Sequence, residues 1–90
     1  MKYIPDYSSE SLEFLEQLDQ ETSVRIAKKI AYFCAASQPL SFAKGLTGKY
    51  KGLFRFRIGD YRAIFRLEPK GVVTILFIIH IAHRSRVYDK

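Results

Sequence analysis

Tryptophan is absent from this chain of 90 residues, and cysteine and methionine each occur only once. A single cysteine, Cys34, cannot form an internal disulfide, so the fold does not depend on an oxidising compartment. One cysteine and two histidines are too few to suggest a zinc site. We therefore expect neither a metal nor another cofactor. Only five glycines and three prolines occur, which excludes a collagen-like or linker-like chain.

Long hydrophobic runs are missing as well. The longest, residues 72–79, includes Thr74 and is far shorter than the roughly 20 residues that cross a bilayer. The first seven residues lack the apolar stretch of a secretory signal. We expect a cytoplasmic protein with no membrane partner. A 48% hydrophobic chain of this length predicts one globular domain over residues 1–90.

Acidic residues are scarce in the second half of the chain. Residues 1–43 hold four basic and six acidic groups, whereas residues 44–90 hold eleven basic and three acidic groups, within a total charge of +6. Basic groups concentrated in one half of a small domain favour a polyanionic partner, because they displace counterions from phosphates.

The hydrophobic pattern predicts an α+β fold. Residues 1–7 are typical of a short strand, which Pro5 restricts to a sheet edge. Ser8 is a candidate N-cap of a first helix that continues to about Gln20, and a second helix runs from about Thr22 to the residues before Ser37. The short connection predicts an antiparallel helix pair. Three strands then form an antiparallel meander, so the helices should cover one face of a four-stranded, mainly antiparallel sheet.

The alternating residues 51–58 and 61–67 predict a β-hairpin with a turn at Gly59 and Asp60. This turn places Ile58 opposite Tyr61 and Arg57 opposite Arg62. Apolar side chains then gather on the face towards the helices. The other face carries Arg55, Arg57, Arg62 and Arg66, with Leu53 and Ile64 between them.

Like charges directly opposite each other destabilise a sheet, so stability alone does not explain this arginine face. A guanidinium group binds phosphate through a fixed fork of donors and also stacks on bases. The sheet face therefore predicts binding of single-stranded or loop RNA. A solvated surface is the alternative.

The order of elements, together with four short motifs, resembles the RelE/ParE superfamily of bacterial toxins. These motifs are Leu46-x-Gly48, Phe54-Arg55-Phe56-Arg57, Gly59-Asp60-Tyr61-Arg62 and His83-Arg84-Ser85-Arg86-Val87-Tyr88. The resemblance covers nearly the whole chain and implies the fold of the RelE-like microbial ribonucleases.

This resemblance implies the toxin of a type II toxin–antitoxin system, and its RelE-like branch implies an mRNA endoribonuclease acting in the ribosomal A site. In that reaction a ribose 2′-OH attacks the adjacent phosphate. The implied catalytic residues are Arg57, Arg62, His83, Arg84 and Tyr88, and the implied RNA-binding residues are Lys44, Lys49, Lys51, Arg55, Arg66 and Arg86. Tyr88 and His83 are alternative proton-transfer groups, since arginine does not readily exchange protons.

The implied partners are mRNA, the ribosome with its 16S rRNA, and a RelB-like antitoxin that forms a hetero-oligomer with the toxin. Two other functions stay open at this stage. A ParE-like toxin has the same fold but inhibits DNA gyrase without cleaving RNA. An inactive relative would bind RNA or sequester antitoxin only.

Overall fold

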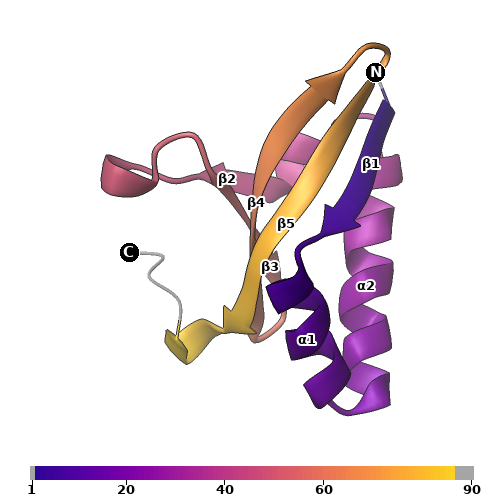
Figure 1. The fold of residues 1–90 in the computed structure, drawn as a ribbon, viewed down its shortest axis with the longest axis vertical. Coiled ribbons are helices and arrows are strands. Elements are labelled where there is room, and N and C mark those ends of the chain that lie inside the picture. The colour runs from indigo at the N-terminus through magenta and orange to yellow at the C-terminus, as the bar shows by residue number, and fades with distance from the viewer. Residues whose placement is uncertain (1, 87–90) are drawn as a thin grey trace.

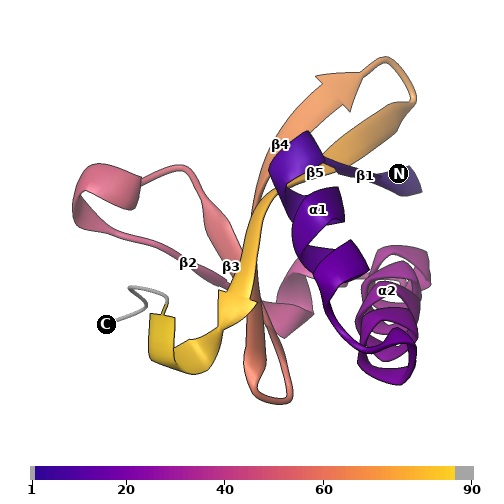
Figure 2. The same cartoon turned by 60° about the horizontal axis from the view of Figure 1, so that its bottom comes forward.

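A computed structural model describes residues 2–86 of the protein. Two helices pack against one side of a strongly twisted sheet, as Figures 1 and 2 show. In chain order the elements are β1 (Lys2–Tyr7), α1 (Ser9–Gln17), α2 (Gln20–Ala35), the short helix η1 (Pro39–Phe42), β2 (Ala43–Gly45), the short helix η2 (Gly48–Tyr50), β3 (Phe54–Ile58), β4 (Tyr61–Lys70), β5 (Val73–His83) and the short helix η3 (Arg84–Arg86). The predicted α+β architecture is confirmed. No helix of residues 2–86 is long and apolar enough to cross a membrane.

The sheet has five strands in the order β1-β5-β4-β3-β2. β1 runs parallel to β5, and the other three pairs are antiparallel. The expected count of four strands is therefore wrong by one. The additional strand, β2, has only three residues and pairs with Phe54–Phe56 of β3. So short a segment carries no alternating pattern by which the sequence would reveal it.

The β3–β4 hairpin has the predicted register, with Ile58 opposite Tyr61 and Arg57 opposite Arg62. Gly59 has φ +60°, and no non-glycine residue among those described has positive φ. A positive φ at the first turn position alone is the pattern of a type II′ turn. Beyond the hairpin, β4 continues through Glu68 and Pro69 to Lys70, and the chain reverses only at residues 71–72.

The first helix, α1, is fastened to the edge of β5 beyond the point where β1 ends. Ser8 caps α1 by accepting a hydrogen bond from the Ser11 amide, and its own hydroxyl lies 2.8 Å from the Ile79 carbonyl oxygen. The Ser11 hydroxyl, which is fully buried, donates to the Ile78 carbonyl at 3.2 Å. Ile78 also pairs with Tyr7 at the end of β1, so these contacts continue the attachment to this edge of β5 from β1 into the start of α1.

The hydrophobic core lies between the helix pair and the inner face of the sheet. Asp19 caps α2 by accepting from the Thr22 amide, so this helix starts earlier than predicted. Ile26, Ile30, Phe33 and Cys34 form its buried face, whereas Val24, although apolar, is 43% exposed. The sheet contributes the buried side chains Phe56, Ile58, Ala63, Phe65, Leu76, Ile78 and Ile81.

Candidate nucleic-acid interface

The predicted arginine face lies on the side of the sheet that the helices leave uncovered. Phe54, Phe56 and Ile58 alternate towards the core, so Arg55 and Arg57 face the other way. One cross-strand row on this uncovered face contains Lys44, Arg55, Ile64 and His80, and the adjacent row contains Arg57, Arg62 and Ala82. We refer to these seven residues, together with Arg66 and Phe77, as the arginine face.

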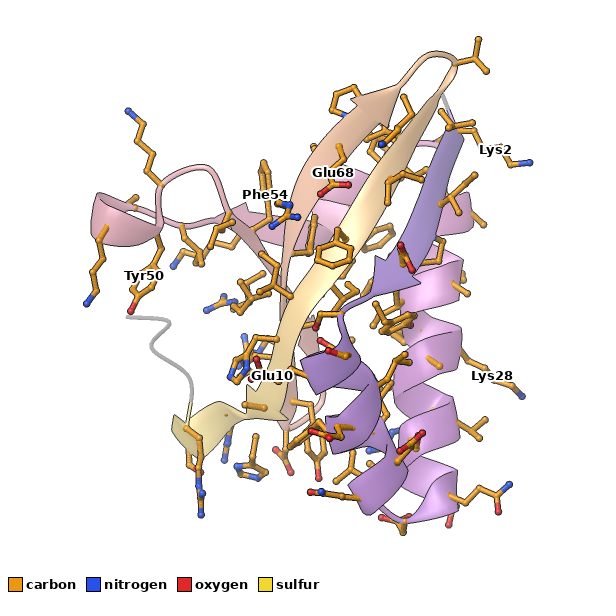
Figure 3. All side chains as sticks on the ribbon, viewed as in Figure 1. Lys2, Glu10, Lys28, Tyr50, Phe54 and Glu68 are labelled. Atoms are coloured by element: carbon orange, nitrogen blue, oxygen red, sulfur yellow. The ribbon has the colours of Figure 1, made fainter. Side chains whose placement is uncertain are left out.

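The cations of the arginine face differ in exposure. Lys44, Arg57 and Arg66 are exposed, and Arg55 is half-buried. The Arg66 guanidinium lies 4.7 Å from the centroid of the Phe77 ring and 2.7 Å from a Glu68 carboxylate oxygen. Glu68 is therefore an acidic neighbour of the arginine face. It lies on β4, which continues to Lys70, and Figure 3 shows Glu68 on this strand.

Arg62 is buried, with a relative exposure of 5%. Its Nη1 donates to the carbonyl oxygens of Gly59 and Tyr61, each at 2.9 Å. These contacts hold the guanidinium group within its own hairpin turn. Register pairs Arg62 with Arg57, but only Arg57 of the two is presented to solvent.

Lys49 and Lys51 lie on the connection between β2 and β3, which projects from the body of the sheet in Figures 1 and 2. Both are exposed, and the Lys49 ammonium group lies 5.4 Å from the centroid of the Tyr50 ring. Tyr50, labelled in Figure 3, lies on the opposite side of the molecule from Lys28 of α2. The projecting segment therefore extends the positive charge of the arginine face outwards.

The end of β5 separates residues that the sequence grouped together. His83 pairs with Tyr61, which puts it on the helix side of the sheet rather than on the arginine face. Its ring meets Tyr61 edge-on, with 5.5 Å between centroids. The Ser85 amide donates to His83 Nδ1 at 3.3 Å, and the Ser85 hydroxyl lies 3.0 Å from the same nitrogen. In the neutral ring this arrangement places the proton on Nε2.

Arg84 lies against the β3–β4 turn. Its amide donates to the Asp60 carbonyl at 2.7 Å, and its Nε lies 3.7 Å from an Asp60 carboxylate oxygen. The Arg84 side chain is 59% exposed, which leaves its guanidinium group accessible to solvent. Arg86 is also exposed. Tyr88 lies outside the described residues.

A β-bulge in β5 determines which histidine joins the arginine face. The register shifts between Ile64, which pairs with His80, and Phe65, which pairs with Ile78, so Ile79 is the additional residue. Beyond it, His80 lies on the face of Ile64 and Arg55. His80 Nδ1 is 2.8 Å from a carboxylate oxygen of Glu10, the second residue of α1. Neither residue was predicted as a site residue from the sequence, because local periodicity does not reveal a bulge.

Two neighbouring pockets of about 310 Å³ each flank this end of β5. One is lined by Glu10, Glu13, Phe14, Gln17, His80, Ile81, Ala82 and Arg86. The other is lined by Phe14, Leu18, Tyr61, Ala82, His83, Ser85 and Arg86. Arg86 thus lines both pockets, one with each histidine. Among residues 2–86, no group of three or more metal-ligating side chains has the geometry to hold a metal ion.

Solved structures of toxin–antitoxin proteins share this fold. The RelBE2 toxin–antitoxin complex from Mycobacterium tuberculosis contains a chain that matches this fold with a TM-score of 0.72 and 21% identity, covering 93% of this chain and all of that one. The RelE–RelB complex from Pyrococcus horikoshii gives 0.66 and 24% identity over 97% of this chain and all of that one. A YoeB/ParE toxin from Agrobacterium tumefaciens gives 0.65 and 22%, over 92% of this chain and 98% of that one.

A family of toxins also matches by sequence. The profile described as ParE toxin of type II toxin–antitoxin system, parDE, matches residues 6–88. The chain belongs to this family, so the predicted membership of the RelE/ParE superfamily is confirmed. Among curated proteins, no sequence matches the chain.

Proposed function

We propose that this toxin is a ribosome-dependent endoribonuclease that cleaves mRNA in the A site. The observation that carries the proposal is the arginine face, where Lys44, Arg57 and Arg66 are exposed and the half-buried Phe77 ring lies against Arg66. Cations fix a phosphate backbone, while apolar and aromatic groups offer surface to bases and riboses.

The reaction needs stabilisation of negative charge on a phosphate that is becoming pentacovalent. Arg57 is the exposed member of the central arginine pair, and Arg84 presents a second exposed guanidinium near the same hairpin. We assign charge stabilisation to these two residues. Arg62, predicted to share this role, is assigned the positioning of the hairpin because its Nη1 is bonded to turn carbonyls.

RNA binding is assigned to Lys44, Lys49, Lys51, Arg55, Arg66 and Arg86, as the resemblance implies. Lys44 and Arg55 share one row with Ile64, and Lys49 and Lys51 extend the surface along the projecting loop. Proton transfer is assigned to Tyr88 or His83 by the same resemblance.

A RelB-like antitoxin is the proposed protein partner. Two of the structural neighbours are toxin–antitoxin complexes. An acidic segment that folds on the arginine face would be drawn to its net positive charge and would block access of RNA.

Inhibition of DNA gyrase is the second candidate function. It is supported by the ParE family profile, which spans residues 6–88. The exposed arginines favour the nuclease, because a surface that only binds a protein has no need for two such groups as Arg57 on the arginine face and Arg84 at the β3–β4 turn.

Two assays on the same purified protein decide between these functions. The protein is added to a cell-free translation extract, in which mRNA integrity is followed, and to a DNA gyrase supercoiling reaction. The proposal predicts truncated mRNA and unimpaired supercoiling. Intact mRNA together with inhibited supercoiling would contradict the nuclease function and support inhibition of DNA gyrase.

A further inference from the structure

We infer that His80, held by Glu10, is the general base that removes the proton from the attacking 2′-OH. The inference rests on the proposed nuclease function and gives the role of base to His80 instead of Tyr88 or His83, the two proton-transfer groups that the resemblance implies. Its structural basis is the contact of 2.8 Å between His80 Nδ1 and the Glu10 carboxylate, at the border between the arginine face and the pocket beside α1.

The Glu10 contact fixes the tautomer of the neutral His80 ring. A carboxylate accepts hydrogen bonds and does not donate them when ionised, so the proton of neutral His80 lies on Nδ1. Nε2 then carries the lone pair that accepts a proton. His83 has the opposite arrangement, because the Ser85 amide donates to its Nδ1. Of the two histidines, His80 is the one whose neutral ring keeps Nε2 as the acceptor.

The position of His80 on the sheet also suits a general base. It lies directly opposite Ile64 and one row away from Arg62, which pairs with Arg57. Arg86, which is exposed, lines the same pocket and provides a cation for the scissile phosphate. Neither Tyr61 nor His83 shares this face, because both lie on the helix side of the sheet.

The β-bulge is what makes this arrangement possible. If Ile79 paired regularly and formed no bulge, the alternation of β5 would turn His80 towards the core and His83 towards the arginine face. The carbonyls of Ile78 and Ile79 are bonded to Ser8 and Ser11, so the start of α1 both stabilises the bulge and supplies Glu10. Glu10 lies beside β5 in Figure 3.

Stability alone does not account for the pair. The side chains of His80 and Glu10 are 31% and 68% exposed, and exposed ion pairs add little to the free energy of folding. The contact with Glu10 instead fixes the orientation of the His80 ring.

The 2′-OH proton moves to His80 Nε2 while the 2′-oxygen forms a bond to phosphorus. The bond from phosphorus to the 5′-oxygen breaks, its electron pair stays on that oxygen, and a water molecule provides the proton. The imidazolium then returns its proton to solvent. The products are a 2′,3′-cyclic phosphate and a free 5′-OH.

The test measures the single-turnover rate of mRNA cleavage on programmed ribosomes at saturating toxin, so that ribosome binding does not limit the signal. His80→Ala is expected to lower the rate by a factor of about 100 or more, and added imidazole should restore part of it. Glu10→Ala should lower the rate roughly tenfold. Glu10→Gln, which keeps an acceptor oxygen, should retain more activity than Glu10→Ala. Glu16→Ala, at an exposed position of α1 that lines neither pocket, is the matched control and should cleave like the wild type.

A second readout is independent of activity. Nitrogen-15 NMR of the neutral imidazole should find the His80 proton on Nδ1 in the wild type and on Nε2 in Glu10→Ala. If the wild type cleaves mRNA and the His80→Ala variant cleaves it equally fast, the role of His80 is overturned and the proposed function stands. Absence of cleavage by the wild type would overturn both.

Discussion

Arg57 and Arg62 lie directly opposite each other across the β3–β4 hairpin, yet only Arg57 reaches solvent. Arg62 is 5% exposed and bonded to the carbonyls of Gly59 and Tyr61. This division resolves the repulsion expected from two facing arginines. One charge is held by carbonyl dipoles of the turn, and the other remains available to a ligand.

Arg62→Ala should therefore destabilise the protein. Loss of the guanidinium group leaves the Gly59 and Tyr61 carbonyls without this donor, at a cost of about 1–3 kcal/mol in the free energy of unfolding. Arg57→Ala, at an exposed position, should change it by no more than about 0.5 kcal/mol. Urea denaturation of the two variants measures both effects. Equal stabilities would contradict the division of roles.

Arg57→Ala should instead reduce activity. Removal of a single preorganised donor to a developing oxyanion lowers a rate by a factor of about 100–1,000. Arg57→Lys should recover part of the rate, because it keeps the charge and loses the planar fork. The rate of mRNA cleavage in translating ribosomes is the measurement. Val24→Ala, at an exposed position of α2 far from the arginine face in sequence, provides a control that should cleave normally.

Ser8→Ala should loosen α1 from β5. The Ser8 hydroxyl lies within hydrogen-bonding distance of the Ser11 amide, which it caps, and of the Ile79 carbonyl. Loss of an N-cap of this kind costs about 1–2 kcal/mol. Ser9→Ala, at the adjacent exposed position, should cost less than about 0.5 kcal/mol. Thermal or urea unfolding compares the pair, and a Ser8→Ala variant as stable as Ser9→Ala would be inconsistent with the described contacts.

Alkaline pH should lower the stability of the folded protein. Burial raises the pKa of Tyr7 to about 12 and that of the Cys34 thiol to about 11. Because the folded state holds these protons more tightly than the unfolded chain, their full contribution to the free energy of unfolding is present below the unfolded pKa values. It is lost as the pH rises towards 11 and 12.

The urea concentration at the unfolding midpoint should therefore decrease as the pH is raised from 9 to 12. The decrease should be smaller in a Tyr7→Phe variant, which has no phenol at position 7 to ionise. Tyr32→Phe, at a side chain 61% exposed, serves as the control and should follow the wild-type pH dependence. A Tyr7→Phe curve that coincides with that of the wild type would show that Tyr7 does not contribute.

Local sequence signals predicted the hairpin well. Gly59 and Asp60 define a turn of known length, and turn length fixes the register, so the pairs Phe56–Ala63 and Arg55–Ile64 follow directly. The N-cap at Ser8 is equally local, since it depends on residues three positions apart. Both features are confirmed.

Features that depend on distant segments were missed. β2 exists only because β3 provides a partner, and the bulge at Ile79 is accommodated by Ser8 and Ser11, about 70 residues earlier in the chain. The burial of Arg62 was missed for another reason, because it depends on how the side chain folds back on its own turn. For the site, alternation therefore predicted the face of Arg55 and Arg57 correctly, but it did not foresee that His80 joins this face and that His83 leaves it.

The most direct test maps new mRNA ends at single-nucleotide resolution in a reconstituted translation system. The toxin, its Arg57→Ala variant and the Val24→Ala control are compared on the same message, with and without ribosomes. The account predicts ends within A-site codons for the wild type and the control, weak ends for Arg57→Ala, and none on naked mRNA. Unchanged mRNA in the presence of active ribosomes, or equal cutting of naked mRNA, would contradict it.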